Sequence, residues 1–202
     1  MRFDLQTIAS WIKPRSRFLD LGCGSGELLS YLHREKGVEG TGIEIDEDEV
    51  SQAILNGANV IHGDIHEEIR DYPSHAFDYV ILSQTLQQVL KPAFLLHEML
   101  RVGSMGVVSF PNFSFIRNRT FLLFRGRAPI SRDLPYEWYD TPNIRIITLK
   151  DFHRFCRIFD FSILKYTAIR SSYDNKGTKV RILPNLFASY GIYLLSRKGL
   201  KE

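Results

Sequence analysis

Hydrophobic residues in the first half of the chain fall into short continuous runs, separated by segments whose apolar positions recur at helical spacing. This alternation is typical of βαβ units around a parallel sheet. The predicted strands cover residues 17–21, 40–45, 58–62, 77–82 and 105–110. The predicted helices cover residues 4–12, 26–35, 47–56, 65–70 and 92–101, the first of them packed on the sheet edge. The pattern therefore predicts an α/β fold with a mostly parallel sheet.

The regular alternation stops at residues 110–112, which read Phe-Pro-Asn. Residues 111–147 are rich in aromatic side chains, prolines and arginines, and we expect a helix near 113–124 followed by an irregular loop. Connections of this length are typical of lids and binding elements. We interpret residues 1–202 as a single domain, with 111–147 as an insertion that covers a substrate or meets a partner. In the alternative interpretation, its aromatic side chains only pack the insertion onto the sheet.

The end of the chain is predicted to complete the sheet. Thr148 is suited to cap a helix that continues through Arg157, and Asp151 stands three residues on, as in a capping box. Apolar runs at residues 162–169 and 190–196 are the last predicted strands, and the segment between them is a loop with some helix. Because no long crossover helix joins these strands, we expect an antiparallel pair.

Composition limits the classes of function. The chain has 202 residues, of which 44% are hydrophobic and 24% charged, as in an ordinary globular domain. No apolar run approaches the roughly 20 residues of a membrane helix, and the first residues lack the features of a signal peptide. Cys23 and Cys156 are too few and too far apart to indicate a disulfide framework or a metal site. We expect a cytoplasmic protein that does not associate with membranes.

Charge is unevenly distributed along the chain. Residues 41–80 carry ten acids against Arg70 alone, whereas residues 111–202 carry seventeen Lys and Arg against seven acids. These charges either lie on solvent-exposed helix faces or mark a basic half that faces an acidic substrate or partner. We do not expect nucleic acid to be that partner, because there is no binding motif and the pI of about 8.8 is below the usual range for such domains.

The most informative motif runs from Phe18 to Gly26, where an apolar strand enters a Gly-x-Gly-x-Gly turn that is followed by a helical segment. Glycines let the backbone approach a ligand closely, and the amides of a helix N-terminus can meet a polar group. Eighteen residues further on, Glu44 ends the next apolar run, where Rossmann-like sheets bind the hydroxyls of a ribose. The motif therefore indicates an adenosyl cofactor. From the glycines and Glu44 alone, an NAD enzyme stays open.

Four signals in order make residues 15–110 resemble the class I methyltransferases that use S-adenosylmethionine. The first is the glycine turn with Asp20, which the resemblance assigns to the methionine end of the cofactor. Glu44 matches the ribose-binding acid, and Asp64 with Ile65 matches the segment that reads adenine. The fourth is the strand and turn over residues 77–88, beside the reacting methyl group. The resemblance implies a Rossmann-like seven-stranded sheet with one antiparallel strand, helices on both faces, and S-adenosylhomocysteine as product or trapped ligand.

The candidate cofactor-binding residues lie on these four segments and include the turn after residue 82. They are Asp20, Gly22, Cys23, Gly24, Ser25, Gly26, Glu44, Ile45, Asp64, Ile65, Ser83, Gln84 and Gln87. No catalytic residue is assigned. Where many small-molecule methyltransferases carry a histidine, this chain has Gln87 or Gln88, and glutamine cannot act as a general base. The turn also lacks the motifs of nucleic-acid methylases, so we expect no nucleic-acid substrate.

The second half narrows the resemblance. The segments 99–103, 108–113, 126–130 and above all 134–144, which reads Leu-Pro-Tyr-Glu-Trp-Tyr-Asp-Thr-Pro-Asn-Ile, resemble the MetW family of methionine biosynthesis proteins. This resemblance implies homoserine O-acyltransferase as a partner. Two functions stay open. One is a cofactor-binding protein that works with the acyltransferase, and the other is an active methyltransferase with a small-molecule acceptor that is independent of it.

Overall fold

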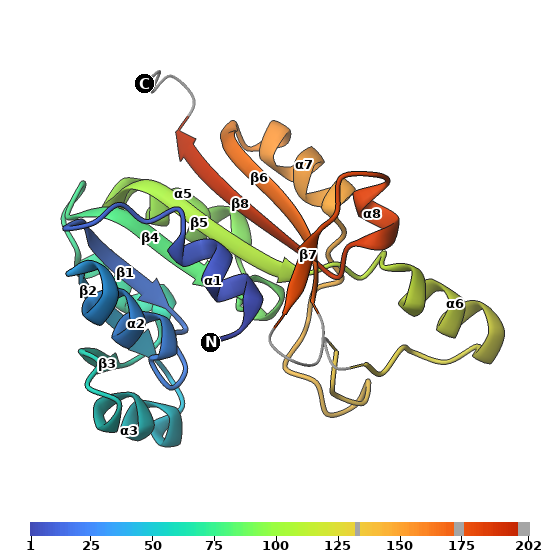
Figure 1. Cartoon of the computed structure of the whole chain (residues 1–202), viewed down its shortest axis with the longest axis horizontal. Coiled ribbons are helices and arrows are strands. Elements are labelled where there is room, and N and C mark those ends of the chain that lie inside the picture. The colour runs from blue at the N-terminus through green and yellow to red at the C-terminus, as the bar shows by residue number, and fades with distance from the viewer. Residues whose placement is uncertain (132–133, 172–175, 198–202) are drawn as a thin grey trace.

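The computed structural model describes residues 1–131, 134–171 and 176–197. Within these residues the strands form one sheet in the order β3-β2-β1-β4-β5-β8-β6-β7 (Figure 1). The strands are β1 (Arg17–Leu21), β2 (Glu39–Glu44), β3 (Val60–His62), β4 (Phe77–Ser83), β5 (Gly103–Pro111), β6 (Phe161–Ser171), β7 (Gly177–Lys179) and β8 (Tyr190–Arg197). The helices are α1 (Phe3–Ala9), α2 (Glu27–Lys36), α3 (Glu47–Leu55), α4 (Ile65–Asp71), the 3₁₀ turn η1 (Leu86–Gln88), α5 (Pro92–Val102), α6 (Ile116–Arg125), α7 (Leu149–Ile158) and α8 (Pro184–Phe187).

Strand directions confirm the predicted fold class. Neighbouring strands from β3 through β5 are parallel, while β8 is antiparallel to both β5 and β6. Among the seven predicted strands β8 is thus the reversed one, and β7 adds an eighth, short strand antiparallel to β6 at the edge. Because parallel strands end on the same side, the carboxyl ends of β1, β2 and β4 lie next to one another.

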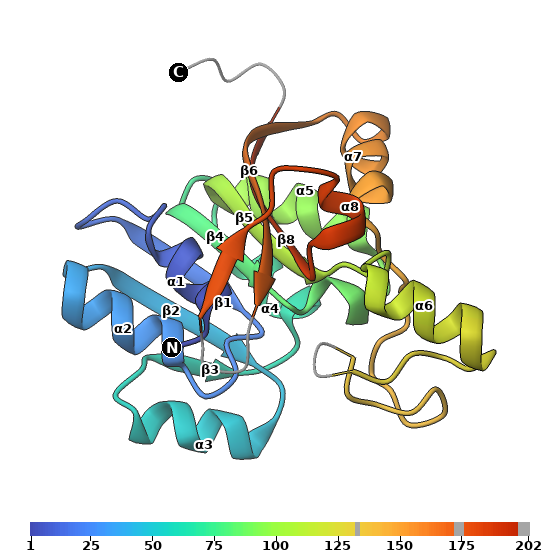
Figure 2. The same cartoon turned by 45° about the vertical axis from the view of Figure 1, so that its right-hand side comes forward.

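The sheet is covered by helices on both faces. One core combines side chains of the sheet with α4, α5 and α7, and includes the aromatic stack of Phe110, Phe152 and Tyr193. The other combines the opposite face with α1 and α2. Figure 2 shows these layers from a second direction. Such two-sided burial explains why the strands read as continuous apolar runs rather than alternating ones.

Two helices differ from the prediction. α1 packs against β6, β8 and α2, over interior strands, so its predicted place at the sheet edge was wrong. α6 begins at Ile116 rather than near residue 113, because Asn112 forms a turn first. The Asn112 side-chain oxygen accepts a hydrogen bond from the Ser114 amide, and its carbonyl accepts one from the Phe115 amide. Asn side chains compete with helix formation in this way.

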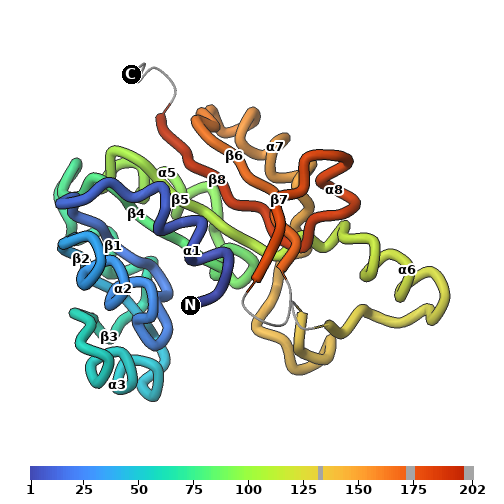
Figure 3. The backbone as a smooth tube through the Cα atoms, viewed as in Figure 1, coloured from blue at the N-terminus to red at the C-terminus, as the bar shows by residue number. Residues whose placement is uncertain are grey.

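The chain between β5 and α7 extends away from the sheet. We call its described residues 116–131 and 134–145 the arm; Figure 3 shows it leaving the body through α6 and returning as an irregular loop. Its base is closed by the Phe113 amide, which donates to the Ile147 carbonyl at 3.0 Å. Thr148 then caps α7 by accepting a hydrogen bond from the Asp151 amide, as the sequence predicted.

No helix in the described part of the chain is both long and apolar enough to cross a membrane.

Candidate functional site

A cavity of about 660 Å³ lies at the carboxyl ends of the parallel strands. It is bounded by the turns after β1, β2, β3 and β4, by α1 and by the arm. Of the predicted site residues, eleven line it: Asp20, Gly22, Cys23, Gly24, Ser25, Glu44, Ile45, Asp64, Ile65, Ser83 and Gln84. The four sequence signals therefore converge on one place, where ligands bind in open α/β sheets.

The glycine turn has the left-handed backbone that its composition predicts. Gly22, Gly24 and Gly26 have φ angles of 70°, 51° and 72°. A Cβ on Gly22 would come within 2.7 Å of Thr85 Oγ1, and one on Gly26 within 2.7 Å of Ala58 Cβ. For Gly24 the nearest atom in the protein would be Glu49 Oε2 at 3.6 Å. Gly22 and Gly26 are thus required by packing within the protein, and Gly24 alone of the three is left open for a ligand to approach.

Glu44 connects two of the turns that bound the cavity. Its Oε2 accepts a hydrogen bond from the Gly24 amide at 2.8 Å, and its Oε1 accepts from the amides of Ile45 at 2.8 Å and Asp46 at 3.1 Å. These bonds hold the carboxylate at the end of β2 in a fixed orientation and use three of its roughly four acceptor sites, which leaves further capacity on Oε2. Glu44 is therefore placed and oriented to accept a hydrogen bond from a ligand hydroxyl.

Asp20 forms the floor of the cavity near the end of β1. Its side chain is only 3% exposed, and its Oδ1 has no hydrogen-bond partner among the described residues. Burial, together with the negative charge of Glu44, raises the pKa of Asp20 from 3.8 to about 7, and the positive charge of Arg2 opposes this rise. A buried carboxylate without a partner is costly, and a cationic donor in the cavity would offset that cost.

The remaining predicted residues occupy different positions. Asp64 caps α4 by accepting a hydrogen bond from the His66 amide at 2.7 Å, and still lines the cavity. Gly26 and Gln87 do not line it. Gln87 is 7% exposed, and its Nε2 donates to the Gln84 carbonyl at 2.5 Å, so it supports the turn after β4 from within the protein.

Sequence reasoning missed the contribution of α1. Arg2 and Leu5 line the cavity, and the buried Asp4 accepts a hydrogen bond from Gln84 Nε2 at 2.6 Å. This bond fixes α1 to the turn after β4, where Gln84 itself has a left-handed φ of 58°. An acid among the apolar positions of α1 was the available signal, because a buried carboxylate requires a partner. The arm contributes Tyr136 and Pro142 to the wall.

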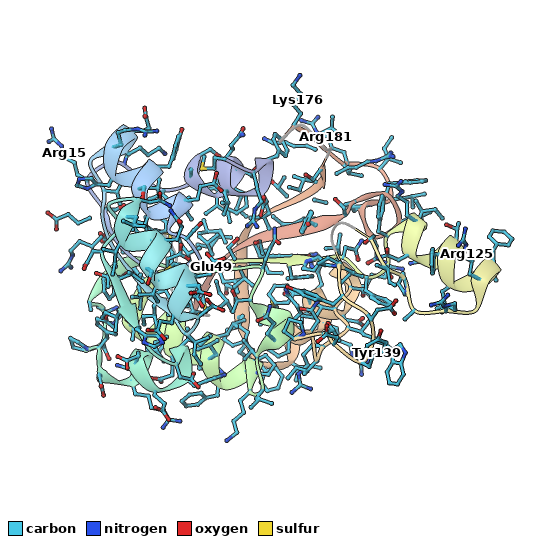
Figure 4. The ribbon with its side chains drawn as sticks, turned by 90° about the horizontal axis from the view of Figure 1, so that it is seen from below. Arg15, Glu49, Arg125, Tyr139, Lys176 and Arg181 are labelled. Carbon is cyan, nitrogen blue, oxygen red and sulfur yellow. The ribbon has the colours of Figure 1, made fainter. Side chains whose placement is uncertain are left out.

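The cavity is strongly acidic. Among the described residues that line it, the carboxylates are Asp20, Glu27, Glu44, Asp46, Glu49 and Asp64, against the single guanidinium of Arg2. Figure 4 labels Glu49, an exposed residue of α3 that lines the cavity. Such a field attracts a cationic ligand and repels a pyrophosphate. The charge therefore disfavours NAD and suits a ligand that carries sulfonium and ammonium groups.

Comparison with known families agrees with this chemistry. The family model described as "Methionine biosynthesis protein MetW" matches residues 2–195. The chain belongs to the MetW family.

A curated relative of this MetW-family chain is the "Bifunctional methionine biosynthesis protein MetXA/MetW" of Rhodopirellula baltica. It is 36% identical over 160 residues, which make up 75% of this chain and 26% of that relative. The "Ubiquinone biosynthesis O-methyltransferase" of Hahella chejuensis is 32% identical over 136 residues, or 62% of this chain and 56% of the relative. The matches thus span about a quarter and about half of the two relatives' own lengths.

Solved structures show the same fold. An S-adenosylmethionine-dependent methyltransferase from Mesorhizobium loti superimposes with a TM-score of 0.69, covering 96% of this chain and 98% of that one. At 16% identity, this likeness shows that the MetW-family chain has the methyltransferase fold. Fold alone does not imply a reaction, so chemistry has to be argued from the site.

The MetW-family cavity offers few groups for covalent chemistry. Burial, with the charges of Asp20 and Glu44, raises the pKa of Cys23, so that its thiol stays neutral and unreactive. His66 is the histidine among the described lining residues, and it lies two residues after Asp64, in α4 rather than in the turn after β4. The described lining residues therefore offer mainly carboxylates and backbone groups, which suit a cationic ligand.

Proposed function

We propose that this chain binds S-adenosylmethionine in the acidic cavity and acts in methionine biosynthesis together with homoserine O-acyltransferase. The observation that carries the proposal is the buried, unpartnered Oδ1 of Asp20 on the floor of a cavity walled by carboxylates. The cofactor is itself a cation, and its ammonium group is the kind of donor that Asp20 lacks.

The residues present fit the cofactor segment by segment. Asp20 with the backbone near Gly24 would hold the methionine end, Glu44 would accept the ribose hydroxyls, and Asp64 with Ile65 would contact the adenine. When bound, the cofactor supplies an activated methyl group on its sulfonium. The chain itself contributes binding, orientation and a negative field that stabilises the positive charge of the ligand.

The proposed partner is supported by the Rhodopirellula baltica relative, whose name describes a bifunctional protein with a MetXA part and a MetW part. Fusion holds two functions at a high effective concentration and is expected where they act together. The alternative function is methyl transfer to a small molecule, which the ubiquinone biosynthesis O-methyltransferase relative favours. Methyl transfer is an in-line displacement, so positioning alone can supply much of the rate, and a general base is useful but not obligatory.

Calorimetric titration with S-adenosylmethionine tests the cofactor part of the proposal. We expect micromolar binding that is lost in Glu44→Ala and retained in Glu47→Ala, an exposed residue of α3 outside the cavity. Micromolar binding that survives Glu44→Ala would contradict the ribose assignment.

The two functions are separated by a rate measurement. Purified homoserine O-acyltransferase is assayed with and without this chain, each with and without S-adenosylmethionine. A change in acyl transfer that requires this chain is expected, and absence of both a complex and a rate effect would exclude the partnership. Labelled methyl that appears in a small molecule from cell extract, and disappears with Asp20→Ala, would instead favour the methyltransferase.

A further inference from the structure

The arm exposes an unusual amount of apolar surface. Asn118 is the buried residue of α6, while Leu123 and Phe124 are 76% and 81% exposed. On the returning loop, Trp138 and Tyr139 pack edge to face with ring centroids 5.6 Å apart and remain 74% and 72% exposed. Exposed apolar side chains gathered in this way mark an interaction site.

The composition of the arm favours a protein partner. Residues 111–147 contain six arginines and no lysine, although the whole chain contains nine lysines. Protein–protein interfaces are enriched in Trp, Tyr and Arg and depleted in Lys, and these three residue types dominate binding energy. Figure 4 shows Arg125 and Tyr139 at the same outer end of the molecule. The arm therefore has the composition of an interface that meets an acidic, apolar protein surface.

The arm is also joined directly to the wall of the cavity. The amides of Ile144 and Arg145 both donate to the Gln87 carbonyl at 3.0 Å. The guanidinium of Arg145 donates to the carbonyls of Val89, at 3.4 Å, and Leu90, at 2.6 Å. We call these four hydrogen bonds the seam. Val89 and Leu90 also line the cavity, so a ligand there would contact residues that hold the arm.

Ligand contact can reach the arm by a second route. Tyr136 and Pro142, which belong to the arm, line the cavity themselves. Near the seam, Gln87 Oε1 and Asn143 Oδ1 are buried without hydrogen-bond partners among the described residues. Buried acceptors without donors favour a rearrangement that supplies them. A ligand in contact with Tyr136 and Pro142 would restrain the arm, and this would reduce the entropic cost of docking a partner.

We propose that the exposed face of the arm is the docking surface for the acyltransferase, and that cofactor in the cavity strengthens this docking through the seam. The proposal rests on the proposed function for the identity of both ligands, and adds the surface and the direction of regulation. Coupling of this kind is reciprocal, so the docked partner tightens cofactor binding by the same factor.

The coupling is tested with purified acyltransferase and S-adenosylhomocysteine, a probe that cannot transfer a methyl group. Saturating probe is expected to raise the affinity of the complex several-fold, and Arg145→Ala, which removes two of the four seam bonds, is expected to lower this ratio of affinities with and without probe, while each ligand still binds separately. Arg181→Ala, an exposed arginine remote from Tyr139 in Figure 4, is the matched control and should leave the ratio intact. A ratio of one in the natural chain, or an unchanged ratio in Arg145→Ala, would overturn the coupling.

The surface is tested by separate variants. Trp138→Ala and Phe124→Ala are expected to weaken the complex by about tenfold or more with no change in affinity for the probe. Leu55→Ala removes an apolar side chain that is 80% exposed on α3, and should have no effect on the complex. Loss of the complex in Leu55→Ala but not in Trp138→Ala would move the interface elsewhere and overturn the assignment.

Other outcomes distinguish this inference from the proposed function. If the probe does not bind the natural chain, the proposed cofactor site is refuted and the coupling with it. The surface variants would still test docking. Binding of the probe without any complex would refute the partner. The chain could instead sediment with phosphatidylglycerol vesicles in a way that requires Phe124, while the complex with the acyltransferase forms without Phe124. That result would assign the arm to a lipid surface and overturn docking.

Discussion

The cavity and the arm use aromatic and charged residues in opposite ways. Around the cavity, functional groups sit at the ends of strands whose own side chains are buried, and hydrogen bonds from backbone amides fix Glu44. In the arm, large side chains such as Phe124 and Trp138 face solvent, and α6 contributes almost nothing to the core. Precise small-molecule sites require rigid support, whereas a docking surface requires exposed area.

This contrast predicts where mutations act. Changes beneath the cavity should alter stability and cofactor affinity together, because the same packing supports both. Changes on the arm should alter association alone. The first experiment compares the two regions directly, and those after it test the cavity side in decreasing order of expected effect.

The first comparison concerns two phenylalanines. Phe110 is fully buried and stacks on Tyr193 with ring centroids 5.6 Å apart, whereas Phe124 is 81% exposed. We expect Phe110→Ala to lower the free energy of unfolding by about 3–5 kcal/mol, and Phe124→Ala to change it by less than about 0.5 kcal/mol. Denaturant unfolding measures both. A large loss of stability in Phe124→Ala would mean that the arm packs against the body and is not a free surface.

The second comparison concerns Glu44, at the centre of the proposed site. Removing a charged acceptor of a ligand hydroxyl should cost about 3 kcal/mol, or roughly 100-fold in cofactor affinity. Calorimetry checks this, with Glu47→Ala as the control on the same segment. Circular dichroism confirms that the variant is folded, since Glu44 also binds the Gly24 amide.

A substitution of Asp20 should change stability and cofactor affinity in opposite directions. Because its pKa rises from 3.8 to about 7 on burial, the folded state binds a proton more tightly than the unfolded chain. Its contribution to stability is therefore lost as pH rises from about 4 to about 7, and stays lost above that. Asp20→Asn should raise the melting temperature by several degrees at pH 8 and weaken cofactor binding about tenfold.

The pH dependence of affinity provides a further readout. In the natural chain, cofactor affinity should fall as pH drops below about 7, where Asp20 becomes protonated. Asp20→Asn should show no such fall. If this variant instead kept the affinity and the pH profile of the natural chain, Asp20 would not be a cofactor-binding residue.

The smallest effect concerns the glycine turn. Gly26 and Gly37 both have left-handed φ angles, of 72° and 59°, but only at Gly26 would a Cβ meet another atom within 4 Å. Gly37→Ala measures the backbone cost alone, about 1 kcal/mol. Gly26→Ala should cost about 1–2 kcal/mol more, because Ala58 must shift. Equal losses in thermal unfolding would show that the turn adjusts without strain.

Much of the fold could be predicted because its signals are local. The strand, turn and helix around Asp20 depend on neighbouring residues, and so does the cap at Thr148. The place of α1 could not be predicted, because an apolar helix face fits any covered surface of a sheet. Its contacts include a hydrogen bond from Gln84 to Asp4, between residues 80 positions apart.

The site was predictable to the same extent. The predicted residues that follow the ends of parallel strands line the cavity, because a parallel sheet brings those ends together. Gln87 did not, because a 3₁₀ turn directs its side chain inward. Arg2, Tyr136 and Pro142 come from distant segments, and no local pattern in the sequence connects them to the cavity.

The most direct test of the central claim is a calorimetric titration of the natural chain with S-adenosylmethionine and, separately, with NAD. The six carboxylates around the cavity predict micromolar binding of the cationic cofactor and no measurable binding of the pyrophosphate. Binding of NAD, or absence of any heat with S-adenosylmethionine, would contradict the account.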